Sequence, residues 1–318
     1  MEINGNNLTN SELLVDEEYN VYYGALHNHT RISDGVGTPY AAYKYARDIA
    51  KMDFFGLSDH GGSISSSEWV TIKKAANSYN VTGKFITFWG FEYTSGSGHI
   101  TVINSDNYLS TTPGFNSLVS WLSNKNALAF FNHPGSTGFN NFEFNRTDKI
   151  VGIELFNKTS GFAFINQYNK AIKKDWYIGA WGGTDNHTGN WGGNTNYRCA
   201  VLAKQLSRES IFEAIKERRF FSTADRNFKL FFKCNGSHMG SKIPAGILNF
   251  NIKASDGSGE KISKITLFKN GYAIQQWDPN SSNPNISVVK NGISGDYFYV
   301  IVKQSDNNEA ISSPIYIK

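Results

Sequence analysis

The feature that most constrains the fold of this chain is an alternation of short apolar segments with longer amphipathic ones, up to about residue 205. The short segments are rich in aromatic and aliphatic residues, which is typical of buried strands. Strands that alternate with helices pair in parallel through crossover connections. The expected strands are residues 21–25, 53–58, 84–94, 99–103, 127–131, 149–156, 176–182 and 197–203.

The helices expected between these strands have recognisable starts. Thr38 is an expected N-cap, with Pro39 at the first helical position. Ser207 is expected to cap a helix over residues 211–219. The other helices are expected at residues 66–79, 115–125 and 162–175. This order of elements predicts an α/β fold, either a barrel or an open parallel sheet.

The pattern changes after about residue 224, where no further helix is expected. A strong hairpin signal, Asn270-Gly271, lies between two of the later strands. The strands expected there are residues 228–235, 246–254, 264–269, 272–277, 287–290, 297–303 and 311–317. We therefore expect a flexible leader at residues 1–19, a barrel at 20–224 and a small C-terminal all-β sandwich domain at 225–318.

Composition excludes some classes of function. The formal charge of +4 is spread along the 318 residues without a basic run, so no nucleic-acid partner is expected. No apolar run approaches the roughly 18 residues that a membrane span needs. Cys199 and Cys234 are expected to be buried apolar residues rather than a disulfide. The oligomeric state is not indicated.

The start of the chain bears on its location. Met1 and Glu2 are followed by a polar, Asn-rich stretch and not by an apolar signal segment. We favour an exported protein, periplasmic or extracellular, whose signal peptide is not part of this sequence, and a cytoplasmic location stays open.

Two histidines stand at the end of the first expected strand. Because side chains alternate along a strand, His27 and His29 project from the same face. Paired imidazoles are good metal ligands, and Asp34, in the turn that follows, adds a carboxylate. This pattern favours a metal site over a surface turn that happens to contain two histidines.

Similar residues recur where later strands begin or end, and Asp185 and His187 form a second pair with the same spacing. Because they come from several strands, they favour a closed barrel with one common site. The set is too large for one ion, since zinc usually takes about four ligands, so two or three ions are expected, with Glu92 bridging two. The expected metal ligands are His27, His29, Asp34, His60, Glu92, His99, His133, Asp185 and His187.

The order of these donors resembles the PHP (polymerase and histidinol phosphatase) superfamily of metal-dependent phosphoesterases over roughly residues 20–224. The resemblance is carried by His-x-His and an aspartate, then Asp-His, a lone glutamate, two further histidines and a final Asp-x-His. The run Gly-Phe-Glu-Tyr-Thr, a nearby Gly-His and the ending Ser-Ser-Pro-Ile-Tyr-Ile resemble the branch that contains carbaryl hydrolase.

The resemblance implies a distorted seven-stranded (β/α)7 barrel, similar to a TIM barrel, with a trinuclear centre of Mn, Zn or Fe. His99 is the least secure match, because it follows Glu92 more closely than in some relatives. The implied ligand sets are His27, His29, Glu92 and Asp185 for one ion, Glu92, His99 and His133 for a second, and Asp34, His60 and His187 for a third.

The implied activity is hydrolysis of a small phosphate ester by a hydroxide that bridges two metal ions, because bound metals lower the pKa of water. Glu92 and Asp185 would act at the centre of this site. Arg31, Lys158 and Arg198 are candidate contacts to the phosphate, although each has the alternative of being a solvated surface cation.

Other residues near the predicted site have supporting or alternative roles. Asp59 is expected to orient a metal ligand without binding the metal itself. Glu154 is expected either to face the site or to pair with an arginine. The glycine-rich loop at residues 189–194 is either a lid over the substrate or a plain surface loop.

Two other functions compete with phosphoesterase activity. The same metal centre would also hydrolyse a carbamate, an amide or a carboxylic ester, as the resemblance to the carbaryl hydrolase branch suggests. A binding protein is the third hypothesis, with a sandwich that recognises a glycan or a surface beside a barrel that has lost its activity. The complete donor set argues against that loss.

Overall fold

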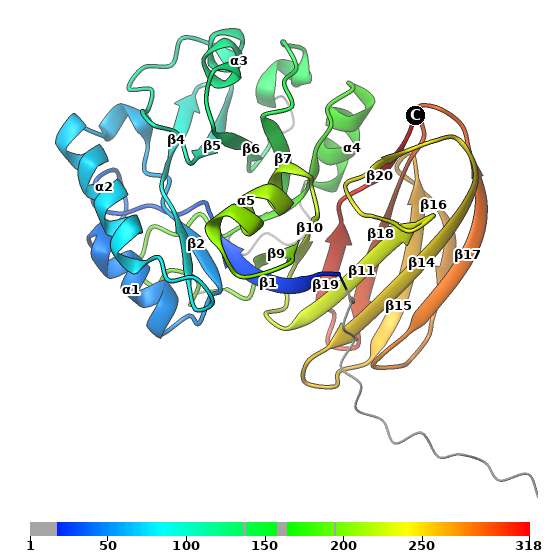
Figure 1. Ribbon diagram of the computed structural model, residues 1–318. Helices are drawn as coiled ribbons and strands as arrows, with labels where there is room; N and C mark the ends of the chain where they lie inside the picture. Colours follow the sequence, from blue (N-terminus) through cyan, green and yellow to red (C-terminus); the bar gives the residue numbers. More distant parts are fainter. Residues whose placement is uncertain (1–17, 136–137, 158–163, 194) are drawn as a thin grey trace, which may run out of the picture.

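The computed structural model describes residues 18–135, 138–157, 164–193 and 195–318. Strands and helices alternate in its first part, and the region after residue 224 consists of strands and loops (Figure 1). The protein is therefore a mixed α/β protein. The α-helices in the described residues are α1 (Pro39–Asp48), α2 (Ser66–Tyr79), α3 (Phe115–Ser123), α4 (Ile165–Lys173) and α5 (Arg208–Lys216), with 3₁₀ turns at Gly61–Ser63 and Gly138–Phe142.

The helix starts follow local capping chemistry. The hydroxyl of Thr38 accepts a hydrogen bond from the Ala41 backbone N–H, and Pro39 opens α1 as predicted. Helix α2 begins with a reciprocal capping box between Ser65 and Glu68, and its bounds match the predicted range. Ser207 caps α5, as the sequence indicates. Among the described helices, none combines the length and the apolar character that a membrane span needs.

Five strands form a separate sheet in the order β4-β5-β6-β7-β8. Their bounds are β4 (Gly90–Ser95), β5 (Gly98–Ile103), β6 (Leu128–Asn132), β7 (Ile150–Asn157) and β8 (Gly179–Gly183). The β6–β7 and β7–β8 pairs are parallel, but β4–β5 and β5–β6 are antiparallel. The expectation of a wholly parallel set is therefore wrong, because a tight turn joins β4 to β5 directly.

The other strands of this part belong to a larger sheet, in the order β10-β9-β1-β2-β3. Strand β9 runs antiparallel to both β1 and β10. The predicted strand 84–94 is in fact two strands, which the chain separates at Trp89 and places in different sheets. The bounds are β1 (Asn20–Ala25), β2 (Phe54–Gly56), β3 (Ile86–Phe88), β9 (Arg198–Ala203) and β10 (Phe220–Thr223).

The sequence predicts a closed barrel, but no ladder among the described residues closes these two sheets into one. Isolated parallel bridges join them instead, between Asn28 and Asn186 and between His60 and Glu92. Strand β8 lies against β9 and β10 without a ladder to either among the described residues. A Cβ atom on Gly182 would lie 2.4 Å from the carbonyl oxygen of Arg198, so glycine permits this close approach.

Side chains from the C-terminal segment satisfy the open edge of β8. The Ser313 hydroxyl accepts from the Ala180 backbone N–H at 3.1 Å and donates to the carbonyl oxygen of Phe220 at 2.6 Å. The Tyr316 hydroxyl accepts from the Ile178 N–H and donates to its carbonyl oxygen. These bonds replace the missing ladder, so the edge of β8 depends on the last residues of the chain.

The C-terminal strands divide between two sheets. Strands β11 (Phe228–Cys234), β12 (Ser237–His238), β14 (Gly246–Asp256) and β17 (Asn285–Gly292) form a four-stranded sheet. The remaining strands join the large sheet, where β19 pairs with β10, so hydrogen bonding continues across residue 224. They are β13 (Lys242–Ile243), β15 (Ile262–Lys269), β16 (Tyr272–Trp277), β18 (Tyr297–Gln304), β19 (Glu309–Ser312) and β20 (Ile315–Ile317).

Details of this region agree with the sequence in part. Asn270 and Gly271 form the turn between β15 and β16, both with positive φ, as the hairpin signal predicts. The predicted strand 311–317 is two strands, β19 and β20. The four-stranded sheet packs against the C-terminal strands of the large sheet through buried aromatic rings. Phe250 of β14 and Phe298 of β18 lie 4.9 Å apart between ring centroids.

Buried aromatic residues fill the space below the strand ends. Trp181 stacks on Phe130 at 4.1 Å between ring centroids and meets Phe220 edge-on at 5.1 Å. These rings belong to one buried cluster, which supports the strands that carry the predicted ligands. Cys199 and Cys234 are both buried and unbridged, as expected.

Candidate metal centre

The end of β1 sets the position of the first histidine pair. His27 and His29 are buried, and their rings lie 5.3 Å apart between centroids. Asn28 points the other way, as strand alternation requires. Its amide donates to the carbonyl oxygen of Gly56 at 3.1 Å, and its side-chain oxygen accepts from the Thr184 hydroxyl at 2.6 Å. The asparagine thus ties the end of β1 to β2 and β8.

The other predicted ligands come from the ends of several strands. His60 follows β2, His133 follows β6, and Asp185 and His187 follow β8. His99 lies near the start of β5, where it pairs with Asn132 at the end of β6. Because β5 is antiparallel to β6, its start lies at the same edge as the end of β6. All nine predicted ligands therefore meet at one edge of the sheets.

Glu92 lies at the centre of these side chains and is 1% exposed. Its Oε1 atom is 3.1 Å from His27 Nε2 and 3.3 Å from His99 Nδ1. Its Oε2 atom is 2.8 Å from His60 Nδ1. Burial raises the pKa of Glu92, but the charge on His27 and hydrogen bonds from the surrounding imidazoles together outweigh it. The net pKa of this carboxyl lies well below its usual value.

The donor atoms fall into four groups, in each of which they lie within 4.8 Å of one another, close enough to share a cation. Glu92 belongs to two of the groups, which is the arrangement that a bridging carboxylate requires. The groups are His29, Asp34, His60 and His187; His27, Glu92 and His133; His27, His29 and Asp185; and His60, Glu92 and His99.

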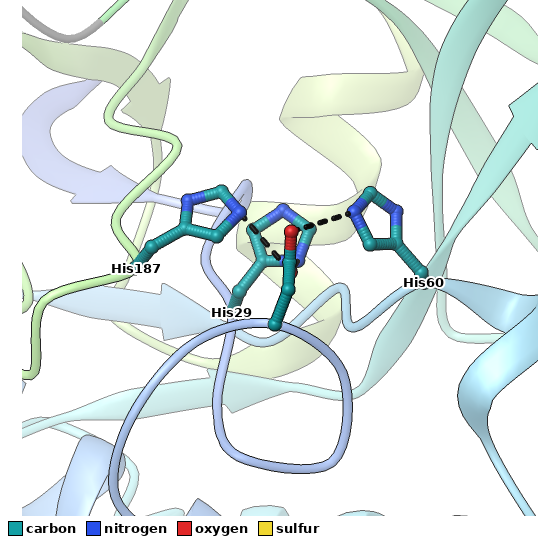
Figure 2. A group of neighbouring side chains, drawn as sticks. His29, His60 and His187 are labelled. Carbon is teal, nitrogen blue, oxygen red and sulfur yellow. Dashed lines mark ion pairs between the residues drawn. The ribbon is translucent and has the colours of Figure 1, made fainter.

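Figure 2 shows the first of these groups, in which three imidazoles surround one carboxylate. The carboxylate of this group belongs to Asp34, with Oδ1 at 3.2 Å from His187 Nε2 and Oδ2 at 3.4 Å from His60 Nε2. The rings of His29 and His187 stack at 4.1 Å between centroids. The carboxylate is more than half exposed, so this group lies at the open side of the site.

Hydrogen bonds fix which nitrogen two of the histidines present. His27 Nδ1 is 2.8 Å from a carboxylate oxygen of Glu154, and His187 Nδ1 is 2.9 Å from the carbonyl oxygen of Asp185. Both partners accept hydrogen bonds, so each Nδ1 carries a proton, and Nε2 is the nitrogen that offers a lone pair when the ring is neutral. His27 Nε2 is then directed at Glu92 and Asp185.

Two buried polar atoms at the centre, His29 Nε2 and Glu92 Oε2, make no hydrogen bond of good geometry among the described residues. Their near neighbours are other candidate ligands, since Asp185 Oδ1 lies 3.3 Å from His29 Nε2 and His60 Nδ1 lies 2.8 Å from Glu92 Oε2. Buried polar atoms are usually bonded, and a cation held between these donors would satisfy both atoms. Imidazole and carboxylate donors together suit Zn, Mn or Fe. The residues present therefore fit the divalent ions that the sequence predicts.

The backbone is strained at two of the candidate ligands. His133 has a φ of 27° and Asp185 has a φ of 43°. Residues other than glycine rarely adopt positive φ values. The Asp185 N–H donates to the carbonyl oxygen of His27 at 2.9 Å, which helps hold this conformation. Such strain tends to concentrate at functional sites.

Two residues support the candidate ligands through hydrogen bonds. Asp59 accepts from the Thr30 N–H at 2.7 Å and from the Ser33 hydroxyl at 2.8 Å, so it fixes the loop that carries Asp34. Sequence reasoning missed Asn132, whose amide donates to Glu92 Oε1 at 2.6 Å. Asparagine is too common in this chain to have signalled that role.

A cavity of about 400 Å³ opens over these donors. Its walls carry imidazole, carboxylate and amide groups, and among the described residues no lysine or arginine lines it. The lining residues are Asp34, His60, Glu92, His99, His133, Asn157, Asp185 and His187.

Two of the predicted phosphate contacts, Arg31 and Arg198, are among the described residues, and neither lines this cavity. Arg198 is 1% exposed and donates to the carbonyl oxygens of Thr195, Tyr197 and Gly192, so its guanidinium is occupied by the backbone. Burial lowers its pKa to about 9. This geometry does not support contact with a phosphate. Arg31 is exposed on the loop between His29 and Asp34, and Lys158 lies outside the described residues.

The loop after His187 packs into the protein through Trp191. Trp191 is 3% exposed and donates its indole N–H to the carbonyl oxygen of His29 at 2.8 Å. A Cβ atom on Gly37 would lie 2.7 Å from the Trp191 ring, which shows how closely the two loops pack. Asn194 lies outside the described residues. Trp191 therefore holds the backbone of the candidate ligand His29 and does not line the cavity.

No family model matches this chain. It is 22% identical over 372 residues to an uncharacterised protein of Chlamydia pneumoniae, covering 95% of this chain and 58% of that protein. It is 23% identical over 355 residues to an uncharacterised protein of Chlamydia trachomatis, covering 93% of this chain and 57% of that protein. The chain thus spans somewhat more than half the length of these relatives.

A solved structure shares the fold over nearly the whole chain. It is a two-domain protein from Bacteroides vulgatus, described as containing a predicted PHP-like metal-dependent phosphoesterase. The TM-score is 0.54 at 16% sequence identity, and the match covers 98% of this chain and 100% of that one. At this identity the similarity shows a common fold.

Proposed function

We propose that this chain is a metal-dependent phosphoesterase of the PHP type, acting on a small phosphate ester. The observation that carries the proposal is the convergence of nine imidazole and carboxylate side chains, seven of which line one cavity, with Glu92 shared between two groups. The buried atoms His29 Nε2 and Glu92 Oε2, which make no hydrogen bond of good geometry among the described residues, support cations as their partners. The Bacteroides vulgatus neighbour supports the fold that goes with it.

We further propose that residues 20–224 form a distorted PHP-type barrel and residues 225–318 a β-sandwich packed against it. The bridges Asn28–Asn186 and His60–Glu92 support this, because they join the two sheets at the level of the candidate ligands. The distortion lies where β8 meets β10, since Ser313 occupies that edge. The relation to the carbaryl hydrolase branch stays part of the proposal.

Three ions would be held by the ligand sets that the family resemblance implies, two of which share Glu92. His27, His29, Glu92 and Asp185 would hold the first, Glu92, His99 and His133 the second, and Asp34, His60 and His187 the third. The third set lies within one donor group of the structure, whereas the donors of the first two sets are divided among the other three groups. Divalent ions held there would supply an activated water near neutral pH and would polarise the phosphoryl oxygens.

The residues of the chain itself bind and orient. Glu92, Asp185 and Asp34 would balance the charge of the bound ions. Asn157 lines the cavity with an amide that already donates to Glu154 at 2.7 Å, so it is held in place to contact a substrate. Arg31, on the exposed loop, is the described cation nearest in sequence to the ligands and stays our candidate for steering an anionic substrate.

A second candidate function is hydrolysis of a carbamate, an amide or a carboxylic ester at the same centre. The observation in its favour is that no lysine or arginine among the described residues lines the cavity. A dianionic phosphate monoester usually needs such a cation, whereas an uncharged ester does not.

Metal analysis and a paired substrate panel test both functions. The purified protein, loaded with Mn or Zn, is assayed on aryl phosphates and nucleotides and on the matching aryl acetate and carbamate. Phosphate release that Glu92→Gln abolishes is the expected result. Greater turnover of the carbamate or acetate would favour the second function, and a chain that binds no metal would contradict both.

A further inference from the structure

We propose that Glu154 is a positioning residue that holds His27 and His133 in the geometry needed to bind metal. The inference rests on the proposed metal centre but does not depend on which ester is hydrolysed. Glu154 lies in β7, the strand of the five-stranded sheet that otherwise contributes no candidate ligand.

Both oxygens of Glu154 are already engaged. The carboxylate is 0% exposed, does not line the cavity and belongs to none of the donor groups. Oε1 lies 2.8 Å from His27 Nδ1, while Oε2 accepts from the His133 backbone N–H at 2.8 Å and from the Asn157 amide at 2.7 Å. Glu154 therefore contacts the candidate ligands His27 and His133 and the neighbouring Asn157. It would affect a bound ion only by positioning these residues.

The bond to His27 determines the tautomer of this ring. A carboxylate only accepts, so Nδ1 must carry the proton and Nε2 must face Glu92 and Asp185. Without the carboxylate, the ring is free to change tautomer or to rotate, and a lone pair would no longer point at the cavity. Mutation of a residue that hydrogen-bonds a metal ligand typically weakens metal affinity by about 10–100-fold.

The bond to His133 acts on the backbone. His133 has a φ of 27°, a conformation that a histidine does not adopt without support. The N–H that donates to Glu154 belongs to this strained residue, so the same carboxylate holds ligands at the ends of β1 and β6. One buried side chain thereby fixes the relative position of two candidate ligands that lie on different sheets.

Gly183 gives independent support, because it leaves the space that the carboxylate occupies. A Cβ atom on Gly183 would lie 1.7 Å from Glu154 Oε1. Gly183 does not have a positive φ, so alanine is compatible with its backbone. Gly183→Ala would therefore displace the Glu154 side chain without removing it.

Two variants and one control test the proposal through metal binding, without any substrate. Glu154→Gln keeps the volume, but its amide can accept on one side only, so it must lose the bond to His27 or the bonds from His133 and Asn157. Gly183→Ala keeps the carboxylate and moves it. Asp256→Asn is the matched control, since Asp256 is a buried carboxylate in β14 that also accepts backbone N–H bonds.

The measurements are the dissociation constant for Zn or Mn by chelator competition, the absorption spectrum of the cobalt-loaded protein, and the melting temperature without metal. Both site variants are expected to bind metal about 10–100-fold more weakly than wild type and to shift the cobalt bands. Asp256→Asn is expected to change neither. The metal-free melting temperature separates this effect from general unfolding.

Unchanged affinity and an unchanged cobalt spectrum in both site variants would overturn the proposal. So would an equal loss of affinity in Asp256→Asn. Metal binding by wild type together with no phosphate release would reject the proposed phosphoesterase and leave the role of Glu154 standing. If the wild-type chain binds no metal, the positioning role fails with the metal centre.

Discussion

The indole N–H of Trp191 donates to the backbone carbonyl oxygen of His29 at 2.8 Å, which links the loop after β8 to the candidate ligand at the end of β1. The carbonyl is buried, because His29 is 0% exposed. The contact therefore stabilises both the fold and the position of one ligand, and these two effects can be separated by experiment.

Trp191→Phe removes this donor and leaves a buried carbonyl without it. We expect the free energy of unfolding to fall by about 1–3 kcal/mol and metal affinity to fall as well. Trp176→Phe is the matched control, since the indole of Trp176 donates to the carbonyl oxygen of Phe142 at 3.0 Å, away from the cavity lining. Urea unfolding and metal titration compare the two. Equal metal affinity in both variants would contradict the prediction.

Removal of divalent ions is expected to lower the melting temperature, because the ions bind the folded chain and not the unfolded one. At a free metal concentration of about 100 times the dissociation constant, binding adds about 2.7 kcal/mol to the free energy of unfolding. Thermal melts after chelation and after reloading measure this difference. Asp185→Asn should respond less to metal. A wild-type melting temperature that does not change when Zn, Mn or Fe is added would count against the metal centre.

The sequence predicted those parts of the site that local geometry determines. Strand alternation alone places His27 and His29 on one face, and the capping box at Ser65 determines where α2 begins. The break at Trp89 was not visible, because the apolar run continues through it while the strands on either side enter different sheets. Sequence patterns report burial, but they do not say which sheet a strand joins.

The roles of the supporting residues could not be predicted in the same way, although the sequence indicates that Glu154 lies near the site. Asn132, Glu154 and Trp191 act through bonds to residues far away in the chain, and each has a residue type with many ordinary roles. Arg198 shows the opposite error, since a cation near a strand end suggested a phosphate contact and the fold uses it on backbone carbonyls. Donor residues of a metal site are recognisable by type, whereas their supports are recognisable only by contact.

Ser313→Ala tests whether the C-terminal segment supports β8. The hydroxyl is buried and bonds both the Ala180 N–H and the Phe220 carbonyl, so its loss leaves two buried backbone groups without this partner. We expect the free energy of unfolding to fall by about 1–3 kcal/mol. Ser120→Ala, on the exposed side of α3, should change it far less. Similar urea midpoints for the two variants would show that β8 does not need this contact.

The partly buried carboxyl of Asp53 predicts how stability varies with pH. Partial burial raises its pKa from the ordinary value of 3.8, and the Tyr23 N–H that donates to it at 2.8 Å only partly offsets this. Asp53 and Lys229 both line a second cavity, of about 270 Å³. A raised folded pKa means that the folded chain binds this proton more tightly than the unfolded chain, so stability is lost as pH rises from 3.8 through the folded pKa.

Asp53→Asn removes this titration while keeping an oxygen for the Tyr23 N–H. The free energy of unfolding of wild type, relative to the variant, is therefore expected to decrease as pH rises through that window and to level off above the folded pKa. Urea unfolding at a series of pH values measures the difference for both proteins. A difference that stays constant, or that grows in favour of wild type as pH rises, would show that burial does not raise the pKa of this carboxyl.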